Sequence, residues 1–579
     1  MPSEETIETD VLVIGGGMAG FFAAIKAKDQ GLDVTLVDKG YVGKAGGTHF
    51  AEGDIMFFRP ERGHKLEEWV NLISERCEYI NNREWDEICL REAKDRYDDL
   101  VSWGIRFYQE DSKLYVFSYY GAAIRTKYED ITMVNREYAP ALREKAVESG
   151  VRVLDRIIVC ELLKQNGEIV GALGFHTISG NLYIFHAKAT VIATAGSSLK
   201  AGTYPVHFWT GDGEAMVYRA GAEIAGKEFM YGTPPLRSDI NRQRQTGKGT
   251  GEVIDVLTRF PFAIGGGFTG WFIPNLNAEG DPVVNPAWEA HCGRAPLYFD
   301  LAAWPPERME WLRSFFKRIG THQPDKIDLD VFRGDKIQWP AARVMTNTIF
   351  AGSGIWPINT SCATAVPGLY AAGNSCATMA SGATYAGMGF GLNHAMVTGN
   401  RAGLTAAEYT SKSKETRIDE AQLKRVKDVV CAPMERKGGF SPRWVTQVLQ
   451  GFTVPYFILG VKHGERLQAA LTIVEFLNSH IVPKLMANDA HEWRLAQETK
   501  NMALIAEMML RASLFRTESR GSHFREDYPR RDDPAWLAWV KLKEEQGEMK
   551  VYKEPVPKKW WPDLTKPYEE RYPRMLPME

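Results

Sequence analysis

Residues 9–38, TDVLVIGGGMAGFFAAIKAKDQGLDVTLVD, decide the fold of this chain. A short apolar run leads into a turn that contains Gly15, Gly17 and Gly20, and a stretch with helical periodicity follows. A second apolar run then ends at Asp38, so the order predicts a strand, a helix and a strand within about thirty residues. In such a unit the glycines let a pyrophosphate approach the start of the helix, and the acidic residue accepts hydrogen bonds from a ribose. The stretch therefore predicts a dinucleotide-binding site.

Two later segments favour FAD over NAD as the dinucleotide. The glycine turn lies at the very N-terminus, and the segment GLYAAGN at 368–374 returns to a strand and a turn much later in the chain. The stretch VIATAG at 191–196 supplies the strand and turn that usually accompany this arrangement. We expect the adenine end of FAD to be bound early in the chain and the flavin end to be closed by the distant segment.

Length and patterning predict an α/β chain of several domains. At 579 residues the chain is too long for one small core. Residues 230–344 lose helical periodicity, whereas apolar positions recur at helical spacing from about 419 to 516. We therefore expect an FAD-binding Rossmann-like domain with an inserted capping domain and a C-terminal helical domain. The expected boundaries are 1–229 and 345–410 for the two parts of the FAD-binding domain, 230–344 for the capping domain, 411–533 for the helical domain and 534–579 for an extended C-terminal tail.

Charge and hydropathy limit the classes of function and the location. The formal net charge is −3, so the clustered excess of Lys and Arg that nucleic-acid binding requires is missing. No run approaches the roughly 18 consecutive apolar residues that span a membrane. The N-terminus, MPSEETIETD, is acidic where a secretory signal is basic and then apolar. We expect a cytoplasmic protein with no membrane span of its own, any attachment to a membrane being made through partners.

The seven cysteines show no spacing typical of a metal site or a disulfide framework. They are Cys77, Cys89, Cys160, Cys292, Cys362, Cys376 and Cys431. Each is more typical of a small buried apolar residue than of a reactive thiol. We therefore expect no metal ion in this chain, so that electrons leaving a bound flavin go to solvent, to the substrate or to another protein.

Six motifs together resemble the flavoprotein family of succinate dehydrogenase, fumarate reductase, L-aspartate oxidase and the adenylylsulfate reductase α subunit. They are GGGMAG at 15–20, KAGGTHFAEG at 44–53, VIATAG at 191–196, TGDGEAM at 210–216, VPGLYAAGN at 366–374 and RTESRGSHFREDYPRRDD at 516–533. They occur in the family order over most of the chain. The resemblance implies an FAD-dependent oxidoreductase that exchanges electrons with an iron–sulfur, ferredoxin-like partner subunit, and it leaves further oligomerisation open.

The resemblance also implies which residues hold FAD. The ADP half is assigned to Gly15, Gly17, Ala19, Gly20, Asp38 and Lys39, the isoalloxazine to Gly46 and Gly47, the adenosine side to Ala195, Gly196 and Asp212, the ribityl region to Gly373 and Asn374, and the pyrimidine edge to a helix opened by Gly389 and Gly391. The positive end of that helix would stabilise a reduced, anionic flavin. The histidine that carries covalent FAD in the respiratory members has no aligned counterpart, because His49 is displaced by about two residues. We expect noncovalent FAD.

The expected substrate groups depart from the respiratory members of this family. Ile349 or Phe350 stands where they have a substrate histidine, and Tyr385 stands where they have a substrate arginine. A carboxylate without a charged partner in a closed site costs several kcal/mol. We therefore expect fumarate and succinate to be poor substrates.

Three residues remain as catalytic candidates, and each has a structural alternative. Trp209 and Arg259 lie in segments similar to the substrate segments of the adenylylsulfate reductase α subunit, but Phe58 aligns with an asparagine expected there. Tyr385, in TYAGMG, resembles the SYPGAG tyrosine of 3-ketosteroid dehydrogenases, which polarises a ketone beside the flavin. The alternatives are a tyrosine packed under the flavin, a core tryptophan and a solvated or structural arginine.

The functional hypotheses are a flavoprotein subunit with an iron–sulfur partner, a self-contained flavin enzyme that acts on an enone or ketone, and an enzyme similar to fumarate reductase. A flavoprotein scaffold without turnover is a further hypothesis. The charged residues between Arg516 and Asp527 are predicted to form a buried ion-pair network between the helical and FAD-binding domains. The tail, with Trp560 and Trp561, is predicted to dock an electron-transfer protein or to pack on its own chain or on a second copy.

Overall fold

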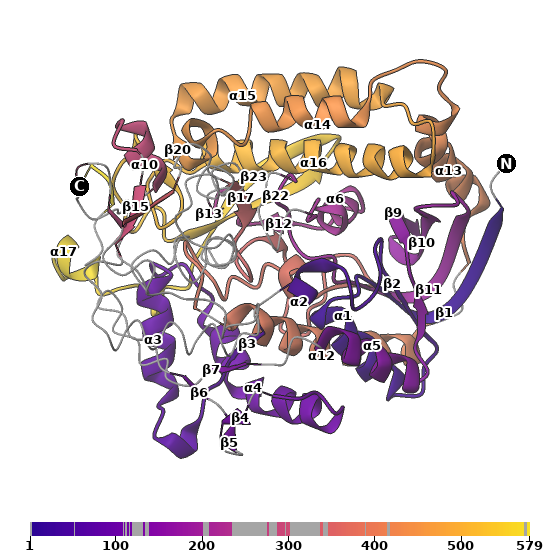
Figure 1. Cartoon of the computed structure of the whole chain (residues 1–579), viewed down its shortest axis with the longest axis horizontal. Coiled ribbons are helices and arrows are strands. Elements are labelled where there is room, and N and C mark those ends of the chain that lie inside the picture. Colours follow the sequence, from indigo (N-terminus) through magenta and orange to yellow (C-terminus); the bar gives the residue numbers. More distant parts are fainter. Residues whose placement is uncertain are drawn as a thin grey trace.

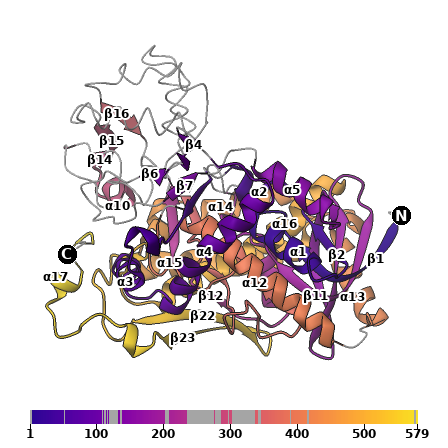
Figure 2. The same ribbon diagram turned by 90° about the horizontal axis from the view of Figure 1, so that it is seen from below.

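The computed structural model shows an α/β body with a layer of helices packed against it (Figures 1 and 2). It describes residues 3–50, 53–107, 109–110, 113–114, 116–117, 131–133, 138–200, 208–233, 275–276, 279, 286–295, 297–300, 336–339, 345–387, 389–413, 417–572 and 576–578. Most of the expected capping domain at 230–344 lies outside these residues, and so does Arg259. Among the described residues, no helix combines the length and the apolar character that a membrane span needs.

The central sheet has the strand order β8-β2-β1-β11-β10-β9, with β19 pairing with β11 off this path. Its strands are β1 (Glu4–Ile14), β2 (Val34–Val37), β8 (Arg152–Leu154), β9 (Ile157–Gln165), β10 (Glu168–His176), β11 (Leu182–Ile192) and β19 (Leu369–Ala371). The strands β8, β2, β1, β11 and β19 are parallel, whereas β10 runs antiparallel to both β11 and β9. Residues Val11 to Ile14 are fully or almost fully buried, as expected for a strand covered on both faces. The predicted βαβ unit is therefore confirmed.

Helix α1 (Met18–Lys28) crosses helix α12 (Phe390–Lys412) at very short range. Gly399 and Gly403 of α12 lie directly over the backbone of Ala19 and Ala23, where an added Cβ would come within 2.4 Å of each alanine carbonyl oxygen. The two helices lie with α5 (Tyr138–Glu148) on one side of the sheet (Figure 1). This close packing joins the first and last parts of the dinucleotide-binding body.

The helical block consists of α13 (Glu420–Glu435), α14 (Pro442–Gly451), α15 (Gly464–Phe476) and α16 (Ala490–Phe515). The side chains of Asp419, His463 and Asp489 accept hydrogen bonds from backbone amides in the first turns of α13, α15 and α16. Helix α16 lies under α14 and α15 and above the sheet region (Figure 1). Its Trp493 stacks on Phe175 of β10 with ring centroids 3.6 Å apart.

The C-terminal segment corrects the expectation of an extended tail. Strands β22 (Ala538–Glu545) and β23 (Glu548–Pro555) form an antiparallel hairpin. Together with β12 (Ile224–Ala225) and β18 (Gly354–Ile355), this hairpin makes a second sheet, separate from the central one. The turn residues Gln546 and Gly547 both have positive φ, as a two-residue hairpin turn of the favoured twist requires. The hairpin is anchored by Trp539, which is 4% exposed and donates its Nε1 hydrogen to the Ile80 carbonyl oxygen at 2.7 Å.

The remaining elements are shorter or more peripheral. They are α2 (Gly46–Phe50), β3 (Asp54–Met56), a 3-10 turn (Pro60–Arg62), α3 (Leu66–Arg76), α4 (Arg83–Ser102), β4 (Gln109–Glu110), β5 (Lys113–Leu114), β6 (Val116–Phe117), β7 (Ile131–Met133), α6 (Asp212–Arg219), β13 (Met230–Thr233), β14 (Asn275–Leu276), α10 (Pro286–His291), β15 (Leu297–Asp300), β16 (Lys336–Trp339), β17 (Met345–Thr348), a 3-10 turn (Gly373–Ser375), π-helical turns (Tyr456–Gly460 and Leu477–Ile481), a 3-10 turn (Val482–Lys484), β20 (Val461–Lys462), β21 (Phe524–Arg525), a 3-10 turn (Lys558–Trp560) and α17 (Tyr568–Arg571). Figure 2 shows β14, β15, β16 and α10 projecting from the main body.

The charged segment after α16 forms the predicted buried ion-pair network. The side chains of Arg516, Glu518 and Arg520 are 0% exposed. Arg516 pairs with Glu228 at 3.0 Å and with Glu518 at 2.7 Å, and Arg520 also pairs with Glu518 at 2.7 Å. Because each buried charge has an opposite partner, the network fixes this segment against the FAD-binding body at Glu228.

Candidate functional site

A cavity of about 880 Å³ lies beyond the C-terminal ends of the parallel strands β1, β2, β11 and β19. This is the edge at which open α/β sheets bind ligands, and the volume falls within the range of small-molecule and cofactor sites. The predicted site residues that line it are Gly15, Gly17, Ala19, Asp38, Lys39, Gly46, Gly47, Ala195, Trp209, Asp212, Gly373, Asn374, Tyr385, Gly389 and Gly391. Gly20 and Gly196 are not among the lining residues, and Arg259 lies outside the described residues.

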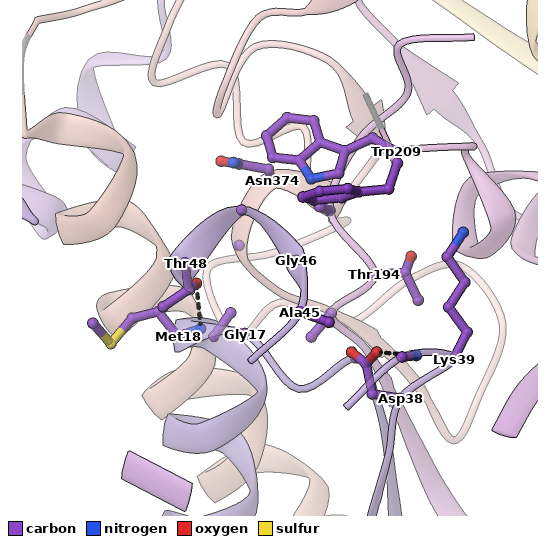
Figure 3. A pocket seen from close by; sticks show the side chains of 18 of the residues that line it. Gly17, Met18, Asp38, Lys39, Ala45, Gly46, Thr48, Thr194, Trp209 and Asn374 are labelled. Atoms are coloured by element: carbon purple, nitrogen blue, oxygen red, sulfur yellow. Dashed lines mark hydrogen bonds between the residues drawn. The ribbon is translucent and has the colours of Figure 1, made fainter. Parts of the chain in front are cut away.

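The glycine turn between β1 and α1 has the geometry that its residues require. Gly15 has φ of +114°, and a Cβ there would lie 2.2 Å from the Ala193 carbonyl oxygen. A Cβ on Gly20 would lie 1.8 Å from the Gly15 carbonyl oxygen, so Gly20 permits the helix to approach the turn instead of facing the cavity. The helix then begins at Met18, whose amide donates to Thr48 Oγ1 at 2.9 Å (Figure 3).

Asp38 is held at the end of β2 by two backbone amides. Its Oδ2 accepts from the Gly16 amide at 2.8 Å, and its Oδ1 accepts from the Gly40 amide at 2.7 Å. An ionised carboxylate has about four lone-pair directions, so acceptor capacity remains for ribose hydroxyls. The two hydrogen bonds thus orient Asp38 toward the cavity and leave its carboxylate able to accept further hydrogen bonds (Figure 3).

The Lys39 side chain extends away from Asp38 (Figure 3), and its ammonium group lies in a cluster of charges. Its Nζ donates to Thr210 Oγ1 at 2.6 Å, Asp212 Oδ2 at 2.8 Å and Glu498 Oε1 at 3.0 Å. Burial alone would lower the pKa of Lys39, but Asp212 and Glu498 outweigh it and raise the pKa above its ordinary value. Lys39 therefore stays charged and ties the end of β2 to α6 and α16.

An aromatic cluster forms another part of the cavity wall. The ring of Phe350 lies 5.4 Å from that of Trp209 and 5.3 Å from that of Tyr385, both in edge-on arrangements. Trp209 is 5% exposed, and its indole lies so close to Gly47 that a Cβ there would be 2.7 Å from Trp209 Cζ2. Of the two residues that the family resemblance places at the missing histidine, Phe350 lines the cavity and Ile349 is buried outside its lining. The three rings give this wall an apolar, uncharged surface.

Tyr385 is fixed at both its backbone and its hydroxyl. Arg76 at the end of α3 donates from Nε to the Tyr385 carbonyl oxygen at 2.8 Å, and Thr384 donates from Oγ1 to the Arg76 carbonyl oxygen at 2.6 Å. The Gly391 amide at the start of α12 donates to Tyr385 Oη at 2.6 Å. That amide was expected to face a flavin edge, and in this structure it contacts the phenol instead.

The residues present fit an FAD. The glycine turn leaves space where Cβ atoms would clash, and the N-cap residue Gly17 places no side chain at the start of α1, which suits a pyrophosphate. Near the aromatic wall, Trp209 Nε1 and Asn374 Oδ1 are buried polar atoms without a hydrogen-bond partner among the described residues (Figure 3). A buried donor and a buried acceptor of this kind are suited to hydrogen-bond a bound group.

Sequence reasoning missed Thr48, Lys200, Arg494 and Glu498, which also line the cavity. Thr48 directly follows the Gly46–Gly47 pair, so its position in the family motif at 44–53 could have identified it as a cofactor-binding candidate. Arg494 and Glu498 lie on α16, inside a stretch that reads only as amphipathic helix. No local pattern connects them to Lys39.

The thiols form no metal site in the part of the chain that the structure describes. All seven cysteines are free, and no group of three or more His, Cys, Asp or Glu residues is placed to hold a metal ion there. Burial raises the pKa of the Cys77 thiol to about 12, and it raises the pKa of Cys431 to about 11. These two thiols are neutral at physiological pH and are poor ligands in that form.

Comparison with known proteins extends these observations along the chain. A family model described as FAD binding domain matches residues 10–392, and a model described as fumarate reductase flavoprotein C-term matches residues 461–572. The chain is 27% identical to a subunit of the fumarate reductase (CoM/CoB) of Methanothermobacter marburgensis, over 93% of this chain and 97% of that protein.

Two solved structures share the fold. Adenylylsulfate reductase from Archaeoglobus fulgidus superimposes with a TM-score of 0.75 at 22% identity, covering 96% of this chain and 97% of that one. Mycobacterium smegmatis Sdh1 in complex with UQ1 superimposes with a TM-score of 0.76 at 25% identity, covering 95% and 94% of the two chains. The likeness therefore includes both the cavity-bearing body and the helical block.

Proposed function

Because this chain belongs to the family of FAD-dependent oxidoreductases that contains the fumarate reductase and succinate dehydrogenase flavoproteins, we propose that it is the catalytic flavoprotein subunit of a complex that exchanges electrons with a separate iron–sulfur protein. FAD, when bound, supplies hydride and single-electron transfer. The observation that carries the proposal is the cavity that joins the Asp38 dinucleotide turn to the wall of Trp209, Phe350 and Tyr385.

The cysteines and the relatives support the proposed partner. The described part of the chain offers no ligand set for an iron–sulfur cluster, so electrons have no second redox centre there. The Methanothermobacter relative, which matches almost end to end, is named as one subunit of a fumarate reductase (CoM/CoB). Both facts favour a chain that works within a larger assembly.

The proposed substrate is not a simple dicarboxylate. The residues at the positions of the substrate histidine and arginine are Phe350 and Tyr385, whose rings meet at 5.3 Å. Neither carries a positive charge to pair with a carboxylate, and an unpaired carboxylate in a closed site is costly. A neutral unsaturated or carbonyl-bearing group fits this wall better.

The proposed site residues that the structure describes have tasks that their geometry allows. Tyr385, held by the Gly391 amide, would give a proton from Oη to a substrate oxygen as negative charge develops on it. Trp209 and Phe350 would pack on the planar part of the substrate and keep water away. Asn374 would orient the cofactor through its buried Oδ1.

Two alternatives have their own support. The relative from Methanothermobacter is named a fumarate reductase, which favours a fumarate-reducing enzyme with substrate cations from another part of the chain. Tyr385 at the cavity wall is equally suited to a self-contained enzyme that transfers hydride to or from an enone or ketone. The substrate spectrum and the requirement for a partner separate these three functions.

The test is anaerobic photoreduction of the purified protein, followed by reoxidation with enones, acrylates, sulfur oxyanions and fumarate. Slow reoxidation by fumarate and rapid reoxidation by an uncharged conjugated carbonyl compound would support the proposed site. Rapid reoxidation by fumarate would overturn the dicarboxylate argument. Co-purification with an iron–sulfur subunit, and electron transfer to it from the reduced chain, would distinguish the complex from the self-contained enzyme.

A further inference from the structure

Helix α16 of the helical block closes the Asp38 end of the cavity. Glu498 and Arg494 of this helix line the cavity together with Lys39 and Lys200. The Glu498 side chain is 1% exposed and accepts from Lys39 at 3.0 Å, from Arg494 at 2.8 Å and from Lys200. One carboxylate from the helical block is thus surrounded by cations at the edge of the dinucleotide site.

A second contact of α16 reinforces the first. Asn501 lies one helical turn beyond Glu498 on the same face, and its Nδ2 donates to Asp212 Oδ1 at 2.8 Å. Asp212 in turn accepts from Lys39 through Oδ2 at 2.8 Å. Lys39 is therefore held by α6 and α16 at once, and it directly follows Asp38 in the chain.

The charges show why Glu498 is central to this cluster. Burial would raise the pKa of Glu498, but Lys39, Lys200 and Arg494 lower it to about 2, so the group is ionised at neutral pH. Without that carboxylate, Lys39 would keep, among the described residues, only its ion pair with Asp212, and Lys200 and Arg494 would lose their ion pairs with Glu498. Lys39 would then lose the partner that fixes its ammonium group toward α16.

We infer that Glu498 is a positioning residue that couples FAD binding to the docking of the helical block. By holding Lys39, it holds the Asp38–Lys39–Gly40 turn in the shape in which Asp38 faces the cavity. The coupling is reciprocal: FAD bound at Asp38 stabilises the docked α16, and docked α16 strengthens FAD binding. The inference rests on the proposed placement of FAD in this cavity.

The decisive variant is Glu498→Gln, which keeps the shape of the side chain and removes its charge. Glu507→Gln is the matched control, because Glu507 also lies on α16 and pairs with Arg511 at 2.8 Å but does not line the cavity. We expect Glu498→Gln to raise the Kd of the full-length apoprotein for FAD about tenfold. Glu507→Gln should leave the Kd close to that of the wild type, because its ion pair with Arg511 lies away from the cavity lining.

A double-mutant cycle tests whether Glu498 acts through Lys39. If it does, Lys39→Met and the double variant Lys39→Met/Glu498→Gln should bind FAD with nearly the same Kd, because Lys39→Met has already removed the ion pair through which Glu498 acts. Additive losses would overturn the positioning role. An unchanged Kd in Glu498→Gln would overturn the coupling, and so would equal losses in Glu498→Gln and Glu507→Gln.

Hydrogen exchange of the wild-type chain provides a measurement that needs no variant. We expect FAD to slow amide exchange in α16 around residues 494–501 more than around 507–515. Equal exchange with and without bound FAD would contradict the coupling, even if a variant fails to fold. A wild-type chain that binds no FAD would instead refute the proposed function itself.

Discussion

The Gly391 amide donates to the Tyr385 hydroxyl at 2.6 Å, which places the phenol oxygen at the N-terminal end of helix α12. The approach depends on Gly389, which has φ of +77° and whose Cβ would lie 2.6 Å from the Met56 amide nitrogen. A donor to the oxygen and the positive end of the helix both stabilise negative charge on it. The arrangement therefore fixes the position of the Tyr385 hydroxyl oxygen at the cavity wall.

Tyr385→Phe should lower kcat for a carbonyl substrate by about 10²- to 10⁴-fold, because it removes the proton donor and keeps the ring. The Kd for FAD should stay near that of the wild type. Steady-state kinetics and a flavin titration measure the two quantities. Tyr409→Phe is the control, since Tyr409 packs against Tyr370 and does not line the cavity. A kcat unchanged in Tyr385→Phe would leave Tyr385 as a packing residue.

Asp38→Ala should weaken FAD retention. Hydrogen bonds to a charged group contribute about 1.5–3 kcal/mol, which corresponds to at least a tenfold increase in Kd. The change also removes the acceptor for the Gly16 and Gly40 amides, which shapes the turn. Flavin occupancy after gel filtration measures FAD retention, and Asp29→Ala, at an exposed position, is the control. Full occupancy in Asp38→Ala would contradict the placement of the ribose.

FAD should be released completely by acid precipitation, leaving a colourless protein pellet. The reason is that His49 lies within α2, about two residues away from the attachment position expected from the family resemblance. Absorbance of the supernatant and flavin fluorescence on a denaturing gel measure the released and retained fractions. A fluorescent protein band that disappears in His49→Ala would show covalent attachment at His49.

Stability should fall as the pH drops below about 6.5 because of the buried His394. Burial lowers the pKa of His394 to about 3, whereas an unfolded histidine takes up a proton near pH 6.5. Between these two pKa values, His394 is protonated only in the unfolded chain. The free energy of unfolding therefore falls by on the order of 1 kcal/mol from pH 7 to pH 5.5. Urea unfolding at the two pH values measures the loss.

The variant His394→Gln should reduce that pH-dependent loss, because glutamine does not titrate and can still bond to Thr378, which His394 contacts at 2.9 Å. The exposed His480→Gln should show the same loss as the wild type. If His394→Gln and the wild type lose equal stability between pH 7 and 5.5, His394 does not titrate as its burial requires.

Some features could be predicted from the sequence because they depend on residues close together in the chain. The turn at Gly15 and the contact of Gly20 with that turn involve neighbours in the chain, so glycine spacing and apolar runs predicted the βαβ unit correctly. Helical periodicity likewise placed the helices between 420 and 515. The C-terminal hairpin was missed, although its alternating side chains and its Gln546–Gly547 turn are also local signals.

Only the tertiary structure shows which residues far apart in the chain lie in contact. The amino-acid sequence alone established the dinucleotide fold and the resemblance to a flavoprotein family, because both depend on short motifs. Folding decided that Phe350 and not Ile349 faces the cavity and that Glu498 meets Lys39, 459 positions away. Such contacts depend on how α16 packs over the sheet edge, and neither side chain carries a pattern that identifies the other.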